Sequence, residues 1–208
     1  MTLTLLAFDA EHDQMGGVTF SMYPGVAGVV LRAQPGAGVL ATQYESEPVL
    51  LAQAVADLME GLPAREVLER LKAQAVRPER IQAGCIDRHG AMAHSPTSVS
   101  GSDEVHIQGD THLVIANTVV AGAAQELDRA FRALIKDGQS LTDALMGAAR
   151  AADASGGDKR GRLAAGLRVT SIRNAADYGM DLRVDAADQP LDELAVLVRD
   201  WAGPSVSS

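Results

Sequence analysis

Cysteine is almost absent from this chain, since Cys85 stands alone among 208 residues. A single cysteine excludes a disulfide within the chain, and this composition is typical of a reducing compartment. Cys85 lies in the apolar stretch 81–86, which has the pattern of a buried strand, so we interpret it as a core residue. A hydrolase that uses the Cys85 thiol is therefore the least favoured of three functional interpretations.

Positive charge and long apolar runs are also scarce. The 18 Lys and Arg are outnumbered by 27 Asp and Glu, which gives a net charge of −9. This balance argues against binding nucleic acid or an anionic membrane surface, because both need basic side chains.

No run reaches 18 uninterrupted apolar residues, so we expect no membrane span. No positive region precedes a longer apolar core at the N-terminus, so we expect no secretory signal and a cytoplasmic location.

Metal and nucleotide motifs are missing as well. The five histidines show no helical i, i+4 pair and no cysteine partner, although His94 and His106 are expected on neighbouring strands. The other three are His12, His89 and His112. The stretch 36–38 (Gly-Ala-Gly) lacks the rest of a dinucleotide fingerprint, and no Gly-Lys-Ser/Thr phosphate loop occurs. We expect neither a metal nor a cofactor.

The first half of the chain has strand patterns followed by two helices. Stretches 3–8 and 18–21 predict an N-terminal hairpin, and 25–43 predicts another strand pair. Ser46 is then expected to cap a helix that ends at Gly61. A second helix is expected to open at Pro63 and to pack beside the first.

The second half repeats this order. Strands are expected at 81–86, 105–108 and 113–115, followed by helices at about 123–136 and after a capping box of Ser140 and Asp143. Two further strands, 167–172 and 180–184, and a helix after Pro190 close the chain. Helix pairs thus alternate with groups of strands, which favours two antiparallel sheets with helical layers outside over parallel winding. No linker is long or polar enough to divide residues 1–208, so we predict one α+β domain.

The first candidate for chemistry is the N-terminus. Methionine before a small residue is commonly removed, which would leave Thr2 with a free α-amine. The reference pKa of such an amine is about 7.7–8.0, so it can act as a general base at neutral pH. Thr2 would then supply both nucleophile and base for acyl transfer. An ordinary strand end is the structural alternative.

The second candidate is a charged turn at 154–162, which contains Gly156-Gly157 and then Asp158, Lys159, Arg160 and Arg162. Two glycines permit backbone angles closed to other residues, and successive amides there can bind an anion. A solvated turn is the alternative.

Two further polar features are a charged strand near the C-terminus and an asparagine that follows an apolar strand. Alternation places Asp181, Arg183 and Asp185 on one face of the strand 181–185, which indicates an ion-pair ladder. Asn117 follows an apolar strand, and its amide could donate into an oxyanion hole or belong to a turn.

Taken together, these segments resemble the bacterial "domain of unknown function 1028" family (DUF1028), which is assigned to the N-terminal-nucleophile (Ntn) hydrolases. The resemblance covers nearly the whole chain. It rests most on 154–161 (ASGGDKRG) and 181–185 (DLRVD). Supporting stretches are 2–9 (TLTLLAFD), 36–43 (GAGVLATQ), 61–64 (GLPA) and 116–118 (ANT).

The resemblance implies a four-layer αββα sandwich, in which the nucleophile is the first residue of the mature chain. The family pattern begins with a small hydroxyl residue, an aromatic residue and a serine, which Thr2, Leu3 and Thr4 match at both hydroxyl positions. The nucleophile's role therefore falls to Thr2 once Met1 is cleaved.

The chain also departs from the family pattern. Leu163-Ala164 replaces a polar Gln-Ser pair, Glu47-Pro48 an Asn-Pro pair, and Ala116 a glycine. These changes point to a different ligand or to lost activity.

We therefore expect an Ntn amidohydrolase that cleaves a small amide or peptide-like bond, with Thr2 and Asn117 as catalytic residues. The alternative is a catalytically silent metabolite-binding or assembly protein. The expected partner is a small-molecule amide, and folds of this kind often pair as homodimers. The candidate substrate-binding side chains are Thr4, Ser21, Gln43, Asp158, Lys159, Arg160 and Arg183.

Overall fold

Two antiparallel sheets form the centre of the computed structural model, which describes residues 2–99, 101 and 103–201. The larger sheet has the strand order β10-β9-β2-β1-β8-β7, and the smaller has the order β3-β4-β5-β6. The strands are β1 (Thr2–Asp9), β2 (Gln14–Ser21), β3 (Leu31–Gln34), β4 (Gly38–Tyr44), β5 (Ile81–Asp87), β6 (Met92–Ser95), β7 (Val105–Gln108), β8 (His112–Asn117), β9 (Ala164–Ser171) and β10 (Met180–Val184).

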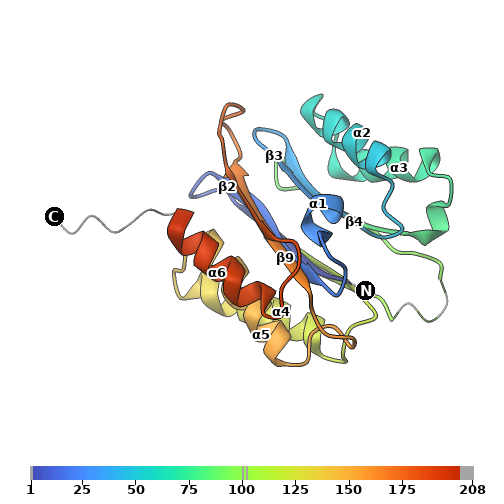
Figure 1. The fold of residues 1–208 in the computed structure, drawn as a ribbon. Coiled ribbons are helices and arrows are strands. Elements are labelled where there is room, and N and C mark those ends of the chain that lie inside the picture. Colours follow the sequence, from blue (N-terminus) through green and yellow to red (C-terminus); the bar gives the residue numbers. More distant parts are fainter. Residues whose placement is uncertain (1, 100, 102, 202–208) are drawn as a thin grey trace.

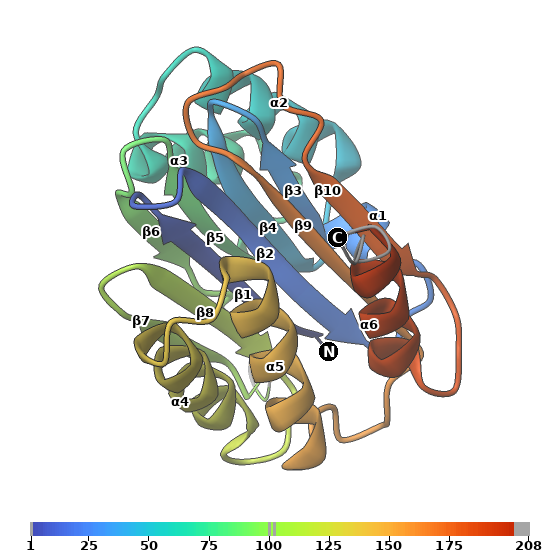
Figure 2. The same ribbon diagram turned by 90° about the vertical axis from the view of Figure 1, so that its left-hand side faces the viewer.

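Helices cover the outer face of each sheet, as both views of the ribbon show (Figures 1 and 2). The smaller sheet is covered by α2 (Pro48–Met59) and α3 (Ala64–Gln74), and the larger by α4 (Ala123–Lys136), α5 (Leu141–Ala154) and α6 (Pro190–Trp201). The helix α1 (Val26–Val30) instead packs into the cluster between the sheets, and a short 3₁₀ helix, η1 (Pro78–Arg80), precedes β5. In the described part of the chain, no helix is both long and apolar enough to cross a membrane.

Three apolar clusters hold these layers together. The largest joins α4, α5 and α6 to the larger sheet, and a second joins α2 and α3 to β4 and β5. The third lies between the sheets and includes Leu6, Ile86 and Leu113. The mixed class and the two antiparallel sheets predicted from the sequence are confirmed.

Alternation along β1 decides which of its residues face the neighbouring sheet. Leu3 and Leu5 belong to the cluster beneath the helices, whereas Leu6 belongs to the cluster between the sheets. Because successive side chains of a strand point to opposite faces, Thr2 and Thr4 share the face of Leu6. The start of β1 therefore directs hydroxyl groups toward the smaller sheet.

The predicted helix ends are right at one position and wrong at another. Ser140 caps α5, and its hydroxyl accepts a hydrogen bond from the amide of Asp143. Ser46 does not cap α2, because Glu47 occupies that position and the Ser46 hydroxyl donates to the carbonyl of Val29. Val29 belongs to α1, which the sequence pattern of 25–43 does not predict.

Helix α1 is placed by a close approach to β9. A Cβ added at Gly166 of β9 would overlap the Cβ of Ala27, so only glycine lets the helix lie this near the sheet. Gly28, in contrast, has only the mobile end of the Arg183 side chain nearby, at 3.0 Å.

We predict that Gly166→Ala lowers the free energy of unfolding by about 1–3 kcal/mol, because the added methyl overpacks this contact. Gly28→Ala is the matched control and is expected to be neutral or stabilising, since Ala exceeds Gly in helix propensity by up to about 1 kcal/mol. Urea unfolding of both variants measures the difference. Equal stability of the two variants would contradict the packing argument.

Candidate functional site

Thr2 lies at the start of β1 beside a pocket of about 680 Å³. Its side chain is among those lining the pocket, although only 4% of the residue is exposed. Met1, whose removal the sequence argument requires, lies outside the described residues. The lining residues are Thr2, Tyr23, Pro24, Val26, Val29, Val30, Gln43, Tyr44, Glu45, Ser46, Glu47, Val76 and Arg77.

Five of the residues predicted from the sequence meet between the sheets. Thr2 pairs with Asn117 across β1 and β8, and the Thr2 hydroxyl donates to the Ser21 hydroxyl over 3.4 Å. From the facing sheet, Gln43 donates its amide to the Thr4 hydroxyl over 2.6 Å. All five are at least 95% buried, so a polar cluster occupies this end of the sandwich.

Two glutamines fix the orientation of the Asn117 amide. Gln43 donates to the carbonyl of Ile115, and Gln82 donates to that of Ala116 over 2.9 Å. Because a carbonyl cannot accept from another oxygen, each glutamine must turn its own oxygen toward Asn117. The Asn117 nitrogen donates to both of these oxygens, over 3.0 and 2.8 Å.

Both amide hydrogens of Asn117 are therefore engaged within the cluster. Its oxygen Oδ1 is buried and has no hydrogen-bond partner among the described residues. As the cluster stands, Asn117 thus offers an acceptor beside Thr2 rather than a free donor. A buried acceptor of this kind is normally paired, so a water, an ion or a group of a ligand is expected to donate to it.

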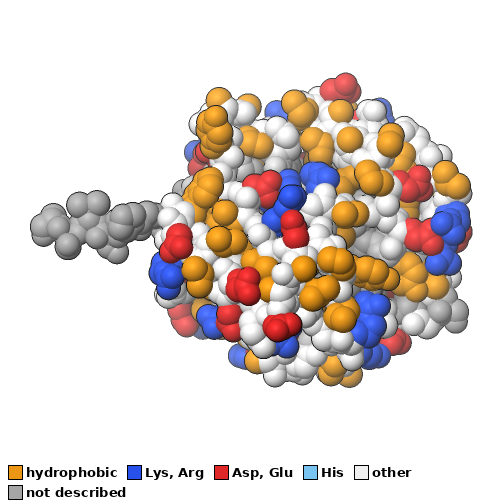
Figure 3. All heavy atoms as spheres, in the orientation of Figure 1, with side chains coloured by type: hydrophobic (Ala, Val, Ile, Leu, Met, Phe, Trp, Pro, Cys, Tyr) orange, Lys and Arg blue, Asp and Glu red, His pale blue; other side chains and the backbone are white. Residues whose placement is uncertain are grey.

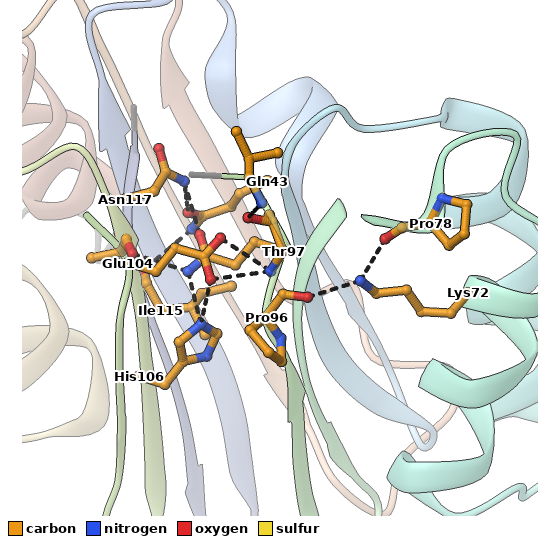
Figure 4. Close-up of polar contacts among 12 residues, drawn as sticks. Gln43, Lys72, Pro78, Pro96, Thr97, Glu104, His106, Ile115 and Asn117 are labelled. Carbon is orange, nitrogen blue, oxygen red and sulfur yellow. Dashed lines mark hydrogen bonds and ion pairs between the residues drawn. The ribbon is translucent and has the colours of Figure 1, made fainter. Parts of the chain in front are cut away.

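The cluster continues to the edge of the larger sheet, as Figure 4 shows. The Gln82 amide contacts Nε2 of His106 at 3.1 Å, and this nitrogen lies 3.4 Å from the carboxylate of Glu104. Sequence reasoning did not single out Gln82 or Glu104. The available signal for Gln82 was a lone amide in a strand that is otherwise apolar up to its last residue, Asp87, and that is buried throughout.

The fixed orientation of Gln82 also sets the tautomer of His106. Because Gln82 donates, Nε2 of a neutral His106 must accept, which leaves the proton on Nδ1, a buried nitrogen without a partner among the described residues. Burial lowers the pKa of His106 below its usual 6.5 and outweighs the opposing effect of Glu104, whose carboxylate could accept from Nε2 only if the ring were protonated. His106 and Glu104 are therefore not an ion pair at neutral pH.

The glycine-rich turn supports this cluster from outside the pocket. The buried carboxylate of Asp158 accepts from the amide of Met22 at 3.3 Å and from that of Arg160 at 2.7 Å. Asp158 also bridges to Val119, which follows β8. The turn thus ties together the ends of β2 and β8, the strands that carry Ser21 and Asn117.

The three cations predicted to bind substrate lie outside the polar cluster around Thr2. The guanidinium of Arg160 stacks over the ring of Tyr23 at 5.3 Å, so it reaches the rim of the pocket. Lys159 pairs with Asp103 at the surface. Arg183 of the edge strand β10 pairs with Asp185, which follows that strand, whereas Asp181 pairs with Arg168 of β9, so the ion-pair ladder predicted along one strand forms only in part. Arg183 does not line the pocket. Figure 3 shows such acidic and basic side chains lying together on one face.

Cysteine and histidine chemistry has no support here. Cys85 points to the cluster beneath α2 and α3, away from Thr2, and burial raises the pKa of its thiol far above the usual range. His94 and His106 are not on neighbouring strands of one sheet: they come from β6 and β7, on different sheets, with ring centroids 4.7 Å apart. Residues 2–99, 101 and 103–201 contain no group of three metal-ligating side chains.

Comparison with known proteins gives a family and a fold. The model of the DUF1028 family, described as a family of unknown function, matches residues 2–194. A crystal structure of a DUF1028 protein from Silicibacter pomeroyi is 20% identical, with a TM-score of 0.85 over 98% of this chain and 90% of that one. Anbu (ancestral beta-subunit) from Yersinia bercovieri is 12% identical, covers all of both chains and has a TM-score of 0.39. No curated protein matches.

We predict that Asp158→Ala lowers the free energy of unfolding by about 2–4 kcal/mol, because two backbone amides lose their acceptor. Lys159→Ala is the control in the same turn, and loss of its exposed ion pair should cost less than about 1 kcal/mol. Urea unfolding checks both. Similar losses would show that the turn does not hold the strand ends.

The depressed pKa of His106 predicts a pH dependence of stability. Below pH 6.5, His106 binds a proton in the unfolded chain but not yet in the folded chain. The free energy of unfolding therefore falls as the pH drops from 6.5 toward the pKa of His106 in the folded chain. His106→Gln should remove this component, whereas His89→Gln on the exposed turn after β5 should keep it. Urea unfolding between pH 5 and 8 on these variants measures it, and an unchanged slope in His106→Gln would overturn the assignment.

Proposed function

Because the chain belongs to the DUF1028 family, whose function is unknown, its chemistry has to be argued from its own site, and we propose that it is an N-terminal-nucleophile amidohydrolase. The substrate is a small molecule with an amide or peptide-like bond. The observation that carries this proposal is a buried hydroxyl at the head of β1, Thr2, which lines a pocket and lies among polar side chains.

The proposed reaction starts when removal of Met1 frees the α-amine of Thr2. The Thr2 oxygen bonds to the carbonyl carbon of the amide, and the hydroxyl proton passes through the α-amine to the leaving nitrogen as the C–N bond breaks. Water then hydrolyses the resulting ester, which returns Thr2 and releases the acid. The reference pKa of an α-amine, about 7.7–8.0, suits both proton transfers at neutral pH.

The fold supports this proposal. Helices lie outside two facing antiparallel sheets, and Thr2 begins a strand whose hydroxyl-bearing face is directed toward the smaller sheet, an arrangement compatible with the αββα layering expected of an Ntn hydrolase. We propose that residues 1–208 form one such domain.

Asn117 has a positioning role in this proposal. It lies directly across from Thr2, where cross-strand Cβ atoms are about 4.5–5.5 Å apart. Its unpartnered Oδ1 would accept a hydrogen bond from the α-amine and turn the nitrogen's lone pair toward the hydroxyl. Donation to an oxyanion by Asn117 would require release of Gln43 or Gln82.

One observation favours the second candidate, a catalytically silent binding protein. The nitrogens of Gln43, Gln82 and Asn117 all donate within the cluster, so none of these three amides holds a free donor for an oxyanion. Such a protein would bind the same small amides without cleaving them.

Intact mass spectrometry and two variants test the proposal. The mature chain should lack Met1, and Thr2→Ala should lower amidase activity by about 10⁴-fold or more, as loss of a nucleophile does. Thr2→Ser keeps a primary hydroxyl and should retain substantial activity, which separates chemistry from packing. A mature chain that retains Met1, or Thr2→Ala with full activity, would exclude the mechanism.

A further inference from the structure

The pocket beside Thr2 has an apolar wall. Helix α1 contributes Val26, Val29 and Val30, and Pro24 precedes it. Val29 is 46% exposed, although a large aliphatic side chain gains free energy when it leaves water. Figure 3 shows hydrophobic side chains next to acidic and basic ones at the surface in the region where Figure 1 places α1. This wall offers surface that an apolar ligand would cover.

Tyrosines extend that surface. Aromatic residues make up only 3% of the chain, yet two of its three tyrosines, Tyr23 and Tyr44, line this pocket. Each ring packs against an arginine, since the guanidinium of Arg160 lies over Tyr23 and that of Arg80 over Tyr44, at 5.3 and 5.9 Å. Rings held in this way contact a ligand at little conformational cost.

The charged side chains of the lining already have partners. Arg77, the only cation among the lining residues named above, pairs with Glu45, and Arg80 pairs with the same carboxylate. Glu47 accepts a hydrogen bond from the amide of Val76 at 3.1 Å. The arginines in and around the pocket, Arg77, Arg80 and Arg160, all pair with carboxylates of the protein. A ligand carboxylate would therefore lose its hydration and have to compete with these partners for a cation.

We propose that this pocket takes an uncharged, apolar acyl group, aromatic or aliphatic, and excludes anionic ones. This inference rests on the proposed function, which places the amide carbonyl of the ligand at Thr2. The apolar part of the acyl group then lies against α1 and the two tyrosines. The volume of about 680 Å³ is that of a pocket for a small molecule.

Binding to the Thr2→Ala variant tests this without turnover. The probes are phenylacetamide, hexanamide, acetamide and 4-carboxyphenylacetamide, titrated into ¹⁵N-labelled protein and followed by NMR. Phenylacetamide and hexanamide should shift the amide signals of Tyr23, Val29 and Tyr44 and bind at least about tenfold more tightly than acetamide or the carboxylate, a difference of about 1.4 kcal/mol. Tighter or equal binding of the carboxylate, or no binding of either apolar amide, would overturn the proposal.

Matched variants locate the binding surface. Val29→Asp should weaken phenylacetamide binding at least about tenfold, whereas Val196→Asp on α6 should leave it unchanged, since Val196 is 43% exposed and does not line the pocket. Tyr23→Ala, at a residue 60% exposed, is a second loss variant that leaves the core intact. Unchanged affinity in both Val29→Asp and Tyr23→Ala would refute the site.

The proposed function can fail separately. If the unmodified protein binds phenylacetamide as described but does not cleave it, the inference on ligand class stands and the hydrolase is excluded. If it cleaves 4-carboxyphenylacetamide faster than phenylacetamide, the hydrolase stands and the inference on ligand class is overturned.

Discussion

Three side-chain amides, those of Gln43, Gln82 and Asn117, connect the two sheets, and the rest of the site depends on them. Each glutamine donates to a backbone carbonyl of β8 and accepts from Asn117. An unpaired polar group in a protein interior costs about 1–3 kcal/mol, so breaking one of these bonds is unfavourable. The network therefore links the two sheets at this end by directional hydrogen bonds in addition to apolar packing.

The hydrogen bonds of these three amides also constrain the residues on either side of them. Toward β7 they oblige Nε2 of His106 to accept a hydrogen bond, so a neutral imidazole completes the network and a protonated one would disrupt it. Toward β1 they use both hydrogens of Asn117 and leave its oxygen as the unsatisfied group beside Thr2. The network thus leaves two buried atoms without a partner among the described residues, Oδ1 of Asn117 beside Thr2 and Nδ1 of His106 near the edge of the larger sheet.

The charged turn and α1 act on the same end of the sandwich. Asp158 holds the end of β2 through the amide of Met22, and Arg160 lies over the ring of Tyr23. Gly166 lets α1 approach β9 closely enough to form the apolar wall of the pocket. The charged turn is therefore tied structurally to the site, although it lies outside the cluster around Thr2.

The sequence by itself determined most strands, most helices and the Ser140 cap, because alternation and capping are local properties of the chain. It also carried the resemblance to the family that the comparisons confirmed. Only the tertiary structure decided which donor meets which acceptor. Gln82 and Asn117 are 35 residues apart and meet because β5 and β8 belong to facing sheets. Periodicity shows which face of a strand a side chain occupies, but not what lies opposite it, so the engaged hydrogens of Asn117, the acceptor role of His106 and the short helix α1 could not be derived from the sequence.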